Sequence, residues 1–256
     1  MHNCLVGSEM CIRDRPYEAS KMPLKFFLKF FQNHGLFKLK NRPQWYTVAK
    51  RSRTYVTKVL SSISGEYYKN YNVNRLIRRS NGIDLHYGDK SEFFSYDKVV
   101  LASHADQALS IIDEPTKEEL EILSKFKYRE NIAVIHTDES IMPNNKDIWS
   151  SWNSSVDKNN IENNSITYWL NLLQNLDFNK NIFLTLNPNF KINEDKILKK
   201  VNFTHPYFDQ SALDNQDKLK NLQNKKNLLF CGSYFGYGFH EDGIKSSIEM
   251  IKAIDV

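Results

Sequence analysis

Glycine is scarce in this chain, and its placement constrains the fold more than any other feature. The 256 residues include only nine glycines, against about 7% in average proteins, and four of them lie between Gly232 and Gly243. This cluster follows an apolar run, LLFC at 228–231, and precedes a segment in which Ile244, Ile248 and Ile251 recur at helical spacing. A strand, a glycine-containing turn and a helix in this order predict the edge of an α/β layer. The N-terminus of such a helix offers N–H groups and a partial positive charge.

The composition is that of a soluble globular chain with one large core or two modest ones. Hydrophobic residues make up 41% and charged residues 25%, which excludes disorder, collagen and a disulfide-rich miniprotein. Lysine and arginine exceed acidic residues by 35 to 30, an excess that a low-GC genome would produce through its bias towards Lys and Asn codons. We therefore expect no nucleic-acid partner.

The cysteines and the apolar runs also indicate the cellular compartment and whether the chain crosses a membrane. The three cysteines, Cys4, Cys11 and Cys231, cannot form a disulfide framework and show no metal spacing, so we expect a reducing, cytoplasmic setting and no metal. The longest apolar stretch, at 26–31, is interrupted by Lys29. It is far shorter than the ~20 residues of a membrane span, and the start of the chain lacks the pattern of a secretory signal.

The first fifteen residues fit no helical or strand period. The stretch CLVGSEMCIRDR at 4–15 is similar to a translated sequencing-library linker. We therefore expect residues 1–15 to be a non-native leader, and the natural N-terminus to have been replaced or truncated.

Helices are expected at four places. At 17–39, Leu24, Phe27, Leu28 and Phe31 fall on one helical face, which either packs on the core or contacts a membrane surface or lipid, and the turn at 33–35 ends this helix. Further helices are expected within 42–60, from Pro115 with Thr116 and Glu119 as a capping box, and at 242–254.

Short runs of β-forming residues predict the strands. Those at 73–79, 83–87, 92–96 and 98–102 read as a meander, and the last has the unbroken apolar pattern of a parallel strand buried on both faces. Three more strands are expected at 132–137, 166–172 and 182–186. The polar stretch at 153–165 reads as an exposed loop.

Several kinds of chemistry are excluded by the motifs. The sequence has no Ser-His-Asp spacing, H-E-x-x-H, C-x-x-C or P-loop, so metal and phosphoryl-transfer chemistry are not expected. The basic cluster of Arg75, Arg78 and Arg79 is short and reads as a solvated face.

The C-terminal segment resembles a known flavoprotein signature. LLFCGS at 228–233, followed by YFGYGFHEDG at 234–243 and IKSS at 244–247, is similar to the C-terminal flavin-binding motif of the FAD-dependent amine oxidase superfamily. It is closest to a bacterial subfamily of NAD/FAD-binding, amine-oxidase-like proteins, often encoded near cyclopropane-fatty-acid synthases. Other stretches match in order, namely FFQNHGL at 30–36, RPQW at 42–45, YDKVVLASHADQAL at 96–109, HTD at 136–138 and WSSWN at 149–153. The resemblance covers residues 17–254.

The resemblance implies an α/β (α+β) fold with FAD as cofactor. It implies a partial FAD/NAD(P)-binding Rossmann-like layer and a mixed-sheet substrate domain of the amine oxidase type. The implied division is a helical part of the substrate domain at 16–45, an FAD-binding segment with the meander at 46–112, the substrate domain at 113–208, and a C-terminal FAD-binding segment at 209–256.

The resemblance also implies which residues hold the cofactor. Gly232 and Ser233 would lie against the pyrophosphate or ribityl chain, and backbone N–H groups of Asp242 and Gly243 would face the pyrimidine edge of the flavin. The remaining implied contacts are Ser52, Arg53, Val73, Ala102, Ser103 and Glu241.

Two departures from the family pattern stand out. The chain has no G-x-G-x-x-G in a βαβ unit. In the internal motif, VAKRSRTYV at 48–56, Lys50 and Arg51 replace small residues, and their side chains would crowd the cofactor.

No catalytic residue is identified outright. His240 and Tyr237, next to the implied flavin helix, are candidates, as are Trp152 and Trp169, which with Trp149 and Tyr168 would line an aromatic substrate cavity or pack in the core. His104 and His136 each follow a predicted strand and are interpreted as structural.

The expected function is an FAD-dependent oxidoreductase that transfers hydride from an organic, amine or lipid-like small molecule to flavin N5. Two alternatives remain open. One is a flavin-dependent desaturase or isomerase of a lipid chain, with weak membrane-surface contact through 24–31. The other is a truncated, catalytically silent fragment that cannot hold FAD.

Overall fold

The structure is a computed structural model that describes residues 23–41, 44, 46, 48–49, 52–88, 92–157 and 160–254. The expected leader at 1–15 and the pair Lys50 and Arg51 lie outside these residues. The chain divides into two compact units. Unit 1 comprises the described residues up to Leu39 together with Tyr128–Asp209, and unit 2 comprises those from Lys40 to Lys127 and from Gln210 onward.

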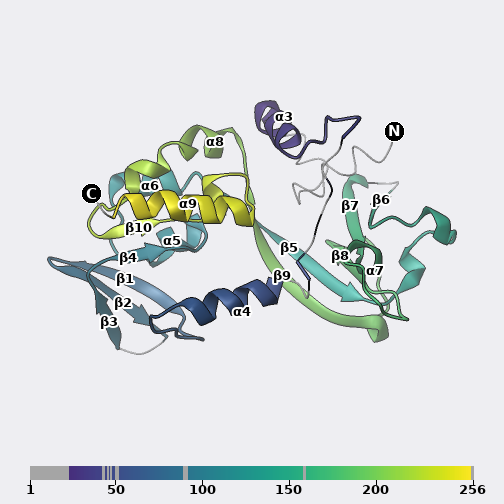
Figure 1. The fold of residues 1–256 in the computed structure, drawn as a ribbon, viewed down its shortest axis with the longest axis horizontal. Coiled ribbons are helices and arrows are strands. Elements are labelled where there is room, and N and C mark those ends of the chain that lie inside the picture. Colours follow the sequence, from purple (N-terminus) through teal and green to yellow (C-terminus); the bar gives the residue numbers. More distant parts are fainter. Residues whose placement is uncertain are drawn as a thin grey trace. The chain divides into compact units, whose positions relative to one another are not determined.

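Unit 1 is built on a five-stranded sheet in the order β6-β7-β8-β5-β9 (Figure 1). The strands are β5 Lys127–His136, β6 Trp152–Asp157, β7 Asn160–Trp169, β8 Phe183–Leu186 and β9 Ile197–Tyr207. Its helical elements are α3 Leu24–Asn33, η1 Glu139–Ile141, η2 Lys146–Ile148, α7 Leu170–Leu173 and η3 Glu194–Lys196. The pairs β6–β7, β7–β8 and β8–β5 are antiparallel.

Unit 2 contains two small sheets and most of the helices. An antiparallel meander is formed by β1 Val73–Arg79, β2 Gly82–Tyr87 and β3 Phe93–Tyr96, and a parallel pair by β4 Val99–Leu101 and β10 Leu228–Phe230. The helices are α4 Ser52–Ser62, α5 Ala105–Ile111, α6 Lys117–Leu123, α8 Gln210–Gln216, η4 Leu219–Leu222, η5 Ser233–Phe235 and α9 His240–Lys252.

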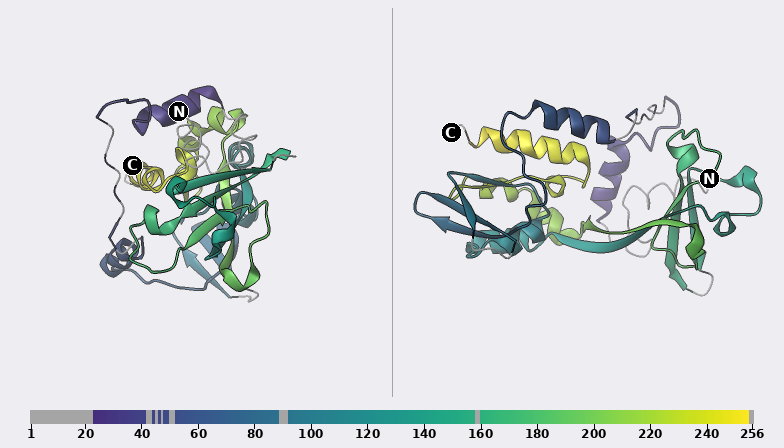
Figure 2. Two further views of the ribbon diagram at one scale, coloured as in Figure 1. Left: turned by 90° about the vertical axis from the view of Figure 1, so that its right-hand side faces the viewer. Right: turned by 90° about the horizontal axis from the view of Figure 1, so that it is seen from below.

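The parallel pair is the centre of unit 2. All three residues of β10 are inaccessible to solvent. On one face of this strand Leu229 and Cys231 pack against Met250 of α9, the yellow helix near the C-terminus in Figure 2. The strand therefore links the C-terminal helix to β4, which precedes it by more than a hundred residues.

Most of the expected elements are confirmed. The meander pairs as predicted, and the fourth run of β-forming residues, β4, leaves it to pair in parallel with β10. The capping box of α6 is present, because Glu119 N–H donates to Thr116 Oγ1 at 3.2 Å and Thr116 N–H donates to Glu119 Oε2 at 2.7 Å. Gly35 ends α3 with a φ of 65°.

The expected exposed loop at 153–165 is wrong. Residues 153–157 and 160–165 belong to the strands of the β6–β7 hairpin, which is paired from Trp152 opposite Tyr168 to Asp157 opposite Asn160. β6 is an edge strand, where polar serine and asparagine side chains can stay hydrated. The hydrogen bonds to β7 therefore outweigh the low strand propensity of these residues. The expected strand at 166–172 is also too long, since β7 ends at Trp169 and α7 follows.

The predicted core face of the first helix is confirmed at Phe31 and wrong at its two leucines. Leu24 and Leu28 are exposed at 68% and 45%, whereas Phe26, Phe30 and Phe31 are buried. Phe26 stacks on Phe208 with ring centroids 5.1 Å apart, because the larger phenyl rings gain more from burial than the leucines do. Among the described residues, no helix is both long and apolar enough to cross a membrane.

Two apolar expectations in unit 2 need correction. Val100 of β4 is 42% exposed, so this strand is not buried on both faces, since α9 packs on β10 rather than on β4. Ile244, Ile248 and Ile251 do share one face of α9, but each is more than half exposed, and the buried residues of the helix are Ser246 and Met250.

The boundaries of the two units differ from the implied domain limits. The structure divides near residues 39, 127 and 209, whereas the resemblance implied 45, 112 and 208. The main difference is α6, which belongs to unit 2 because α5 and the segment η4 contact it.

Glu119 should be the most sensitive acidic residue of α6. Its side chain is 3% exposed, caps the helix and forms an ion pair with Arg78, whose own side chain is 15% exposed. Replacing Glu119 by alanine should lower the free energy of unfolding by about 3 kcal/mol, because a buried guanidinium loses its counter-ion. Urea denaturation followed by circular dichroism measures this loss.

Glu121→Ala is the matched control on the same helix. Glu121 is 63% exposed and forms a surface ion pair with Lys117, so the loss should stay within about 0.5 kcal/mol. Equal losses for the two variants would contradict the role of the buried pair.

Candidate functional site

The two parallel strands of unit 2 end side by side. Leu101 pairs with Phe230, and the N–H of Cys231 donates to the Leu101 carbonyl at 3.1 Å. Because parallel strands present their carboxyl ends at the same edge, Ala102-Ser103 and Gly232-Ser233 leave the sheet together. These four residues, expected from the sequence to contact a cofactor, are brought together by the structure.

Gly232 occupies a position that no larger residue fits. Its φ is 155°, and a Cβ there would lie 2.7 Å from the Tyr234 ring and 3.5 Å from the Ser103 carbonyl oxygen. Glycine alone has the conformational freedom and the small volume that this close approach requires. The tight turn at the end of β10 is therefore set by one residue.

Ser246 of α9 fixes this turn to the helix. Its buried hydroxyl accepts a hydrogen bond from Gly232 N–H at 2.9 Å and donates to the Gly243 carbonyl at 2.7 Å. The start of α9 is thus held against the ends of the two strands, so that the helix N-terminus and the strand ends form one edge.

Asp242 braces the second half of the turn. One carboxylate oxygen accepts hydrogen bonds from the N–H groups of Tyr237 and Phe239, both at 3.0 Å. The carboxylate also fills the space that a Cβ on Gly236 would need. Gln216 of α8 adds hydrogen bonds to the carbonyls of Tyr234 and Gly236 at 3.1 and 2.6 Å.

The free N–H groups of α9 are not the ones expected. The N–H groups of Asp242 and Gly243 both donate to the Phe239 carbonyl, at 3.1 and 3.2 Å, so they are not available to a ligand in this geometry. In the described part of the chain no acceptor is found for the backbone N–H groups of His240 and Glu241. These are the first two residues of the helix, where unpaired donors and positive potential concentrate.

The beginning of α4 approaches the same edge. Tyr55 lies one turn after Ser52 and Arg53, and its hydroxyl is 3.2 Å from Nδ1 of His240. The expected contacts on α4 and α9 therefore lie near each other within unit 2. Val73, by contrast, begins β1 and belongs to the meander.

The four catalytic candidates are divided between the units. His240 and Tyr237 belong to unit 2, where His240 is exposed and Tyr237 is half-buried. Trp152 and Trp169 belong to unit 1, on paired strands.

An aromatic hollow of about 850 Å³ lies in unit 1, between η1, η2, α7 and the β6–β7 hairpin. Trp149 and Trp152 line it. Trp169 packs behind it, with its ring centroid 5.3 Å from that of Trp149. Tyr168 stands opposite Trp152 across the hairpin. Of the aromatic residues expected to line a cavity, two do so.

A buried polar network centred on His136 lies beside this hollow in the sheet of unit 1. His136 is inaccessible to solvent, and its Nδ1 accepts a hydrogen bond from Asp138 N–H at 3.2 Å. Its Nε2 therefore carries the proton and donates to Thr185 Oγ1 at 2.8 Å. Burial lowers the pKa of His136, and this effect outweighs the nearby negative charge of Asp138, which would raise the pKa. The histidine is neutral and fully bonded, which fits the structural interpretation.

His104, the other histidine interpreted as structural, occupies the N-cap position of α5. Its backbone N–H donates to Gln107 Oε1 at 3.3 Å, and its carbonyl accepts from Ala108 N–H at 2.8 Å. Both contacts use backbone groups of His104, which lies three residues after the end of β4.

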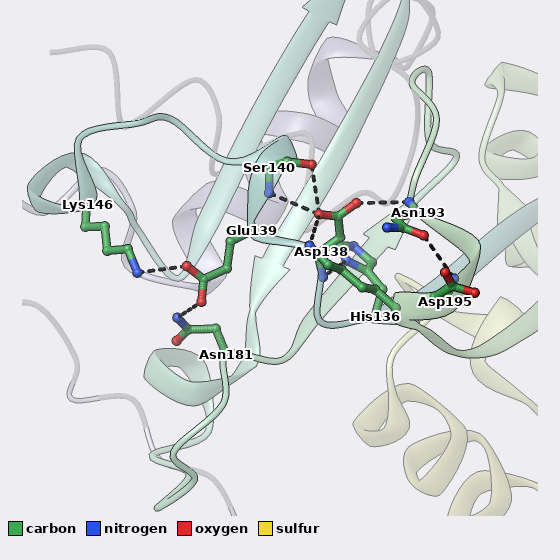
Figure 3. Close-up of polar contacts among 9 residues, drawn as sticks. His136, Asp138, Glu139, Ser140, Lys146, Asn181, Asn193 and Asp195 are labelled. Atoms are coloured by element: carbon green, nitrogen blue, oxygen red, sulfur yellow. Dashed lines mark hydrogen bonds and ion pairs between the residues drawn. The ribbon is translucent and has the colours of Figure 1, made fainter.

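Two neighbouring carboxylates point in different directions from the same turn (Figure 3). Glu139 faces Lys146 and Asn181, with hydrogen bonds of 2.8 and 2.7 Å. Asp138 is 2% exposed and accepts hydrogen bonds from Asn193 N–H at 2.9 Å, Ser140 and Lys196. Burial alone would raise the pKa of Asp138, but these hydrogen bonds hold it far below its usual range.

Some residues of the site carry no clear sequence signal. Ser246 follows Gly243 by one helical turn, a spacing that could have suggested a contact between them. Gln216 comes from α8, and nothing in the sequence relates it to the turn that it braces. Among the described residues no cluster of side chains could hold a metal ion.

Comparison with known proteins identifies the fold. No protein-family model and no curated protein matches the sequence. Among solved structures, a fatty acid isomerase from P. acnes that produces CLA is similar with a TM-score of 0.58 and 14% identity, over 82% of this chain and 53% of that one. A proposed protoporphyrinogen oxidase from Exiguobacterium has a TM-score of 0.60 and 10% identity, over 91% and 58% of the two chains.

A putrescine oxidase bound to putrescine is also similar, with a TM-score of 0.51 and 9% identity, over 80% and 52% of the two chains. The chain thus spans little more than half the length of these neighbours. The neighbours are of the FAD-dependent amine oxidase type, so the resemblance found in the sequence is confirmed at the level of the fold.

Unit 1 should lose stability in acid through Asp138. Because its folded pKa is depressed, the carboxylate stabilises the fold above about pH 4 and this contribution is lost as the pH falls through the folded value. Asp138→Asn should lower the free energy of unfolding by about 2 kcal/mol at pH 7, and the difference from the parent chain should shrink between about pH 4 and pH 2. Tryptophan fluorescence during urea denaturation reports it, because Trp149 and Trp169 lie in this unit.

Glu194→Gln is the control, since Glu194 is 69% exposed in the same unit. It should change stability by less than about 0.5 kcal/mol at every pH. A difference for Asp138→Asn that stays constant from pH 7 to pH 2 would contradict the role assigned to its charge.

The Gly232 turn should not tolerate a methyl group. Gly232→Ala should destabilise unit 2 by about 1–3 kcal/mol, because alanine resists this φ and meets the Tyr234 ring. Gly65→Ala is the matched control, since a Cβ on Gly65 would have no atom within 4 Å. Thermal denaturation of the two variants measures the difference in stability. Equal melting temperatures would disprove the claim that position 232 requires glycine.

Proposed function

We propose that the chain forms the cofactor and substrate domains of an FAD-dependent oxidoreductase of the amine oxidase type. One observation carries the proposal, namely that the carboxyl ends of β4 and β10 meet the N-terminus of α9 through the Gly232 turn. Dinucleotides bind at such edges in α/β sheets, where backbone can approach the phosphates closely. Unit 2 would be the cofactor domain and unit 1 the substrate domain.

The residues present fit a dinucleotide at this edge. Gly232 and Ser233 supply a turn without side-chain bulk, and the free N–H groups of His240 and Glu241 are placed to donate to an anionic or carbonyl oxygen. We assign to these two donors the role that the sequence suggested for the N–H groups of Asp242 and Gly243. Asp242 would then act through its carboxylate, by keeping the turn closed.

The remaining proposed contacts come from the strand end and from α4. Ala102 and Ser103 would line the edge beside Gly232, and Ser52 and Arg53 would face it from the start of α4. Val73 remains a proposed contact on the adenine side, through the meander. FAD, when bound, would supply the acceptor for a hydride, and the protein would orient the substrate and stabilise charge on the flavin through the N-terminus of α9.

A second candidate, a flavin-dependent isomerase or desaturase of a lipid chain, is favoured by the aromatic hollow. Among the described residues that line it, none is charged. An amine substrate would find no counter-ion there, whereas an apolar chain would be well accommodated.

FAD binding tests the proposal directly. Titration of the purified chain with FAD, followed by flavin fluorescence and thermal denaturation, should show saturable binding and a raised melting temperature, since a ligand at 100 times its Kd stabilises by about 2.7 kcal/mol. Ser246→Ala should weaken binding about tenfold, because the Gly232 N–H loses its acceptor. Gly65→Ala should bind FAD as the parent chain does.

Two outcomes would count against the proposal. No binding by a folded parent chain would support the alternative of a silent fragment, which the absence of G-x-G-x-x-G from the sequence favours. Unchanged affinity in folded Ser246→Ala would remove the Gly232 turn from the cofactor site.

A further inference from the structure

The aromatic hollow of unit 1 has a rigid floor. The indole N–H of Trp149 donates to the Pro143 carbonyl at 2.7 Å. The Trp149 ring lies edge-on to Trp169 and to Phe183, at 5.3 and 5.7 Å between centroids, and Met142 completes this buried cluster. The floor is therefore preformed, as ligand sites usually are.

The walls of the hollow expose apolar surface. Ile148, Trp152 and Leu172 all line it, and they are exposed at 60%, 37% and 53%. They come from three separate elements, η2, β6 and the short helix α7. Exposed apolar side chains that gather around one hollow mark a place where a ligand can bury them.

The lining carries hydroxyls but no charge. In a chain that is 25% charged, the described residues of this hollow include no acidic or basic side chain. Lys146 contacts the floor, with its Nζ 5.1 Å from the Trp149 ring centroid, and forms an ion pair with Glu139. Its charge is thus already balanced.

The polar groups available to a ligand are neutral. Within the described chain, the hydroxyls of Ser151 and Ser154 in the lining have no hydrogen-bond partner. The side chains of Asn153 and Thr167 are already engaged, with the Ser150 carbonyl and with Thr185 Oγ1. A ligand can therefore gain hydrogen bonds to hydroxyls, but an ionised head group would lose water without gaining an opposite charge.

We propose that the aromatic hollow binds an uncharged amphiphile, with an apolar chain against Ile148, Trp152 and Leu172 and a neutral hydroxyl or ester at the serines. Its volume of about 850 Å³ lies within the range of small-molecule sites. As a binding site the hollow depends on unit 1 alone. As the substrate site of the enzyme it rests on the function proposed above.

Three probes with one chain and different head groups test the assignment. 1-Octanol, octylamine and octanoate are titrated at pH 7.5 without FAD, below their micelle concentrations, and tryptophan fluorescence is followed. 1-Octanol should bind at least about tenfold more tightly than either ion, because only the neutral head escapes the cost of desolvating a charge. The experiment needs no flavin, so its result and that of the FAD titration are independent.

Variants place the binding in the hollow. Trp152→Ala should weaken 1-octanol binding about tenfold through lost apolar contact, whereas Phe178→Ala, which removes a ring that is 62% exposed elsewhere in unit 1, should leave it unchanged. Ser154→Asp should reverse the preference towards octylamine by supplying a counter-ion. Circular dichroism establishes that each variant is folded.

Several results would overturn the proposal. These are equal binding of octylamine and 1-octanol by the parent chain, absence of binding of all three probes, or equal losses in Trp152→Ala and Phe178→Ala. If 1-octanol binds and FAD does not, the hollow stands and the flavin-dependent function fails. If FAD binds and 1-octanol does not, the assignment of the hollow fails and the flavin-dependent function stands.

Discussion

Unit 2 depends on the parallel pairing of β4 with β10. The two strands are three residues each and are separated by more than a hundred residues of chain, so their hydrogen bonds close a long loop whose ordering entropy must be recovered elsewhere. Recovery comes from burial, since Leu228, Leu229 and Phe230 are inaccessible to solvent. The pairing sets the strand ends side by side, and Ser246 then fixes α9 against them. The candidate cofactor edge thus follows from one non-local contact.

The two units differ in how their polar groups are hydrogen-bonded. In unit 2, backbone groups of the Gly232 turn are satisfied by single side chains, Ser246, Asp242 and Gln216. Within the part of the chain that the structure describes, the first N–H donors of α9 have no acceptor. In unit 1, His136 and Asp138 are buried and fully bonded, and the described residues that line the neighbouring hollow carry no charged side chain. Free donors suit an anionic ligand, whereas an uncharged, aromatic lining suits an apolar one. These properties support the proposed assignment of the cofactor to unit 2 and of the substrate to unit 1.

The sequence predicts local structure well where a local interaction decides it. The capping box of Thr116 and Glu119 and the turn at Gly35 depend on neighbours within a few residues. The strands β4 and β10 are indicated by their own apolar runs, although their pairing is non-local. The sequence fails where partners are distant. The serines and asparagines of β6 form a strand because β7 pairs with them, and α3 buries Phe26 rather than Leu24 because Phe208 lies against it. For the same reason Gln216 could not be assigned to the site, whereas Gly232 and Ser233 could.

The scarcity of glycine also has a physical account. Of the seven described non-glycine residues with positive φ, six are asparagines, the residue that tolerates the left-handed region best after glycine because its amide can bond to nearby backbone. Asparagine thus serves open turns such as those at Asn187 and Asn224. It cannot replace glycine at Gly82 or Gly232, where a Cβ would meet the Tyr96 carbonyl oxygen at 2.6 Å or the Tyr234 ring at 2.7 Å. Gly65 lies in open space, where a side chain would fit, whereas Gly232 must be glycine because the Tyr234 ring and the strand end at Ser103 leave no space for a Cβ.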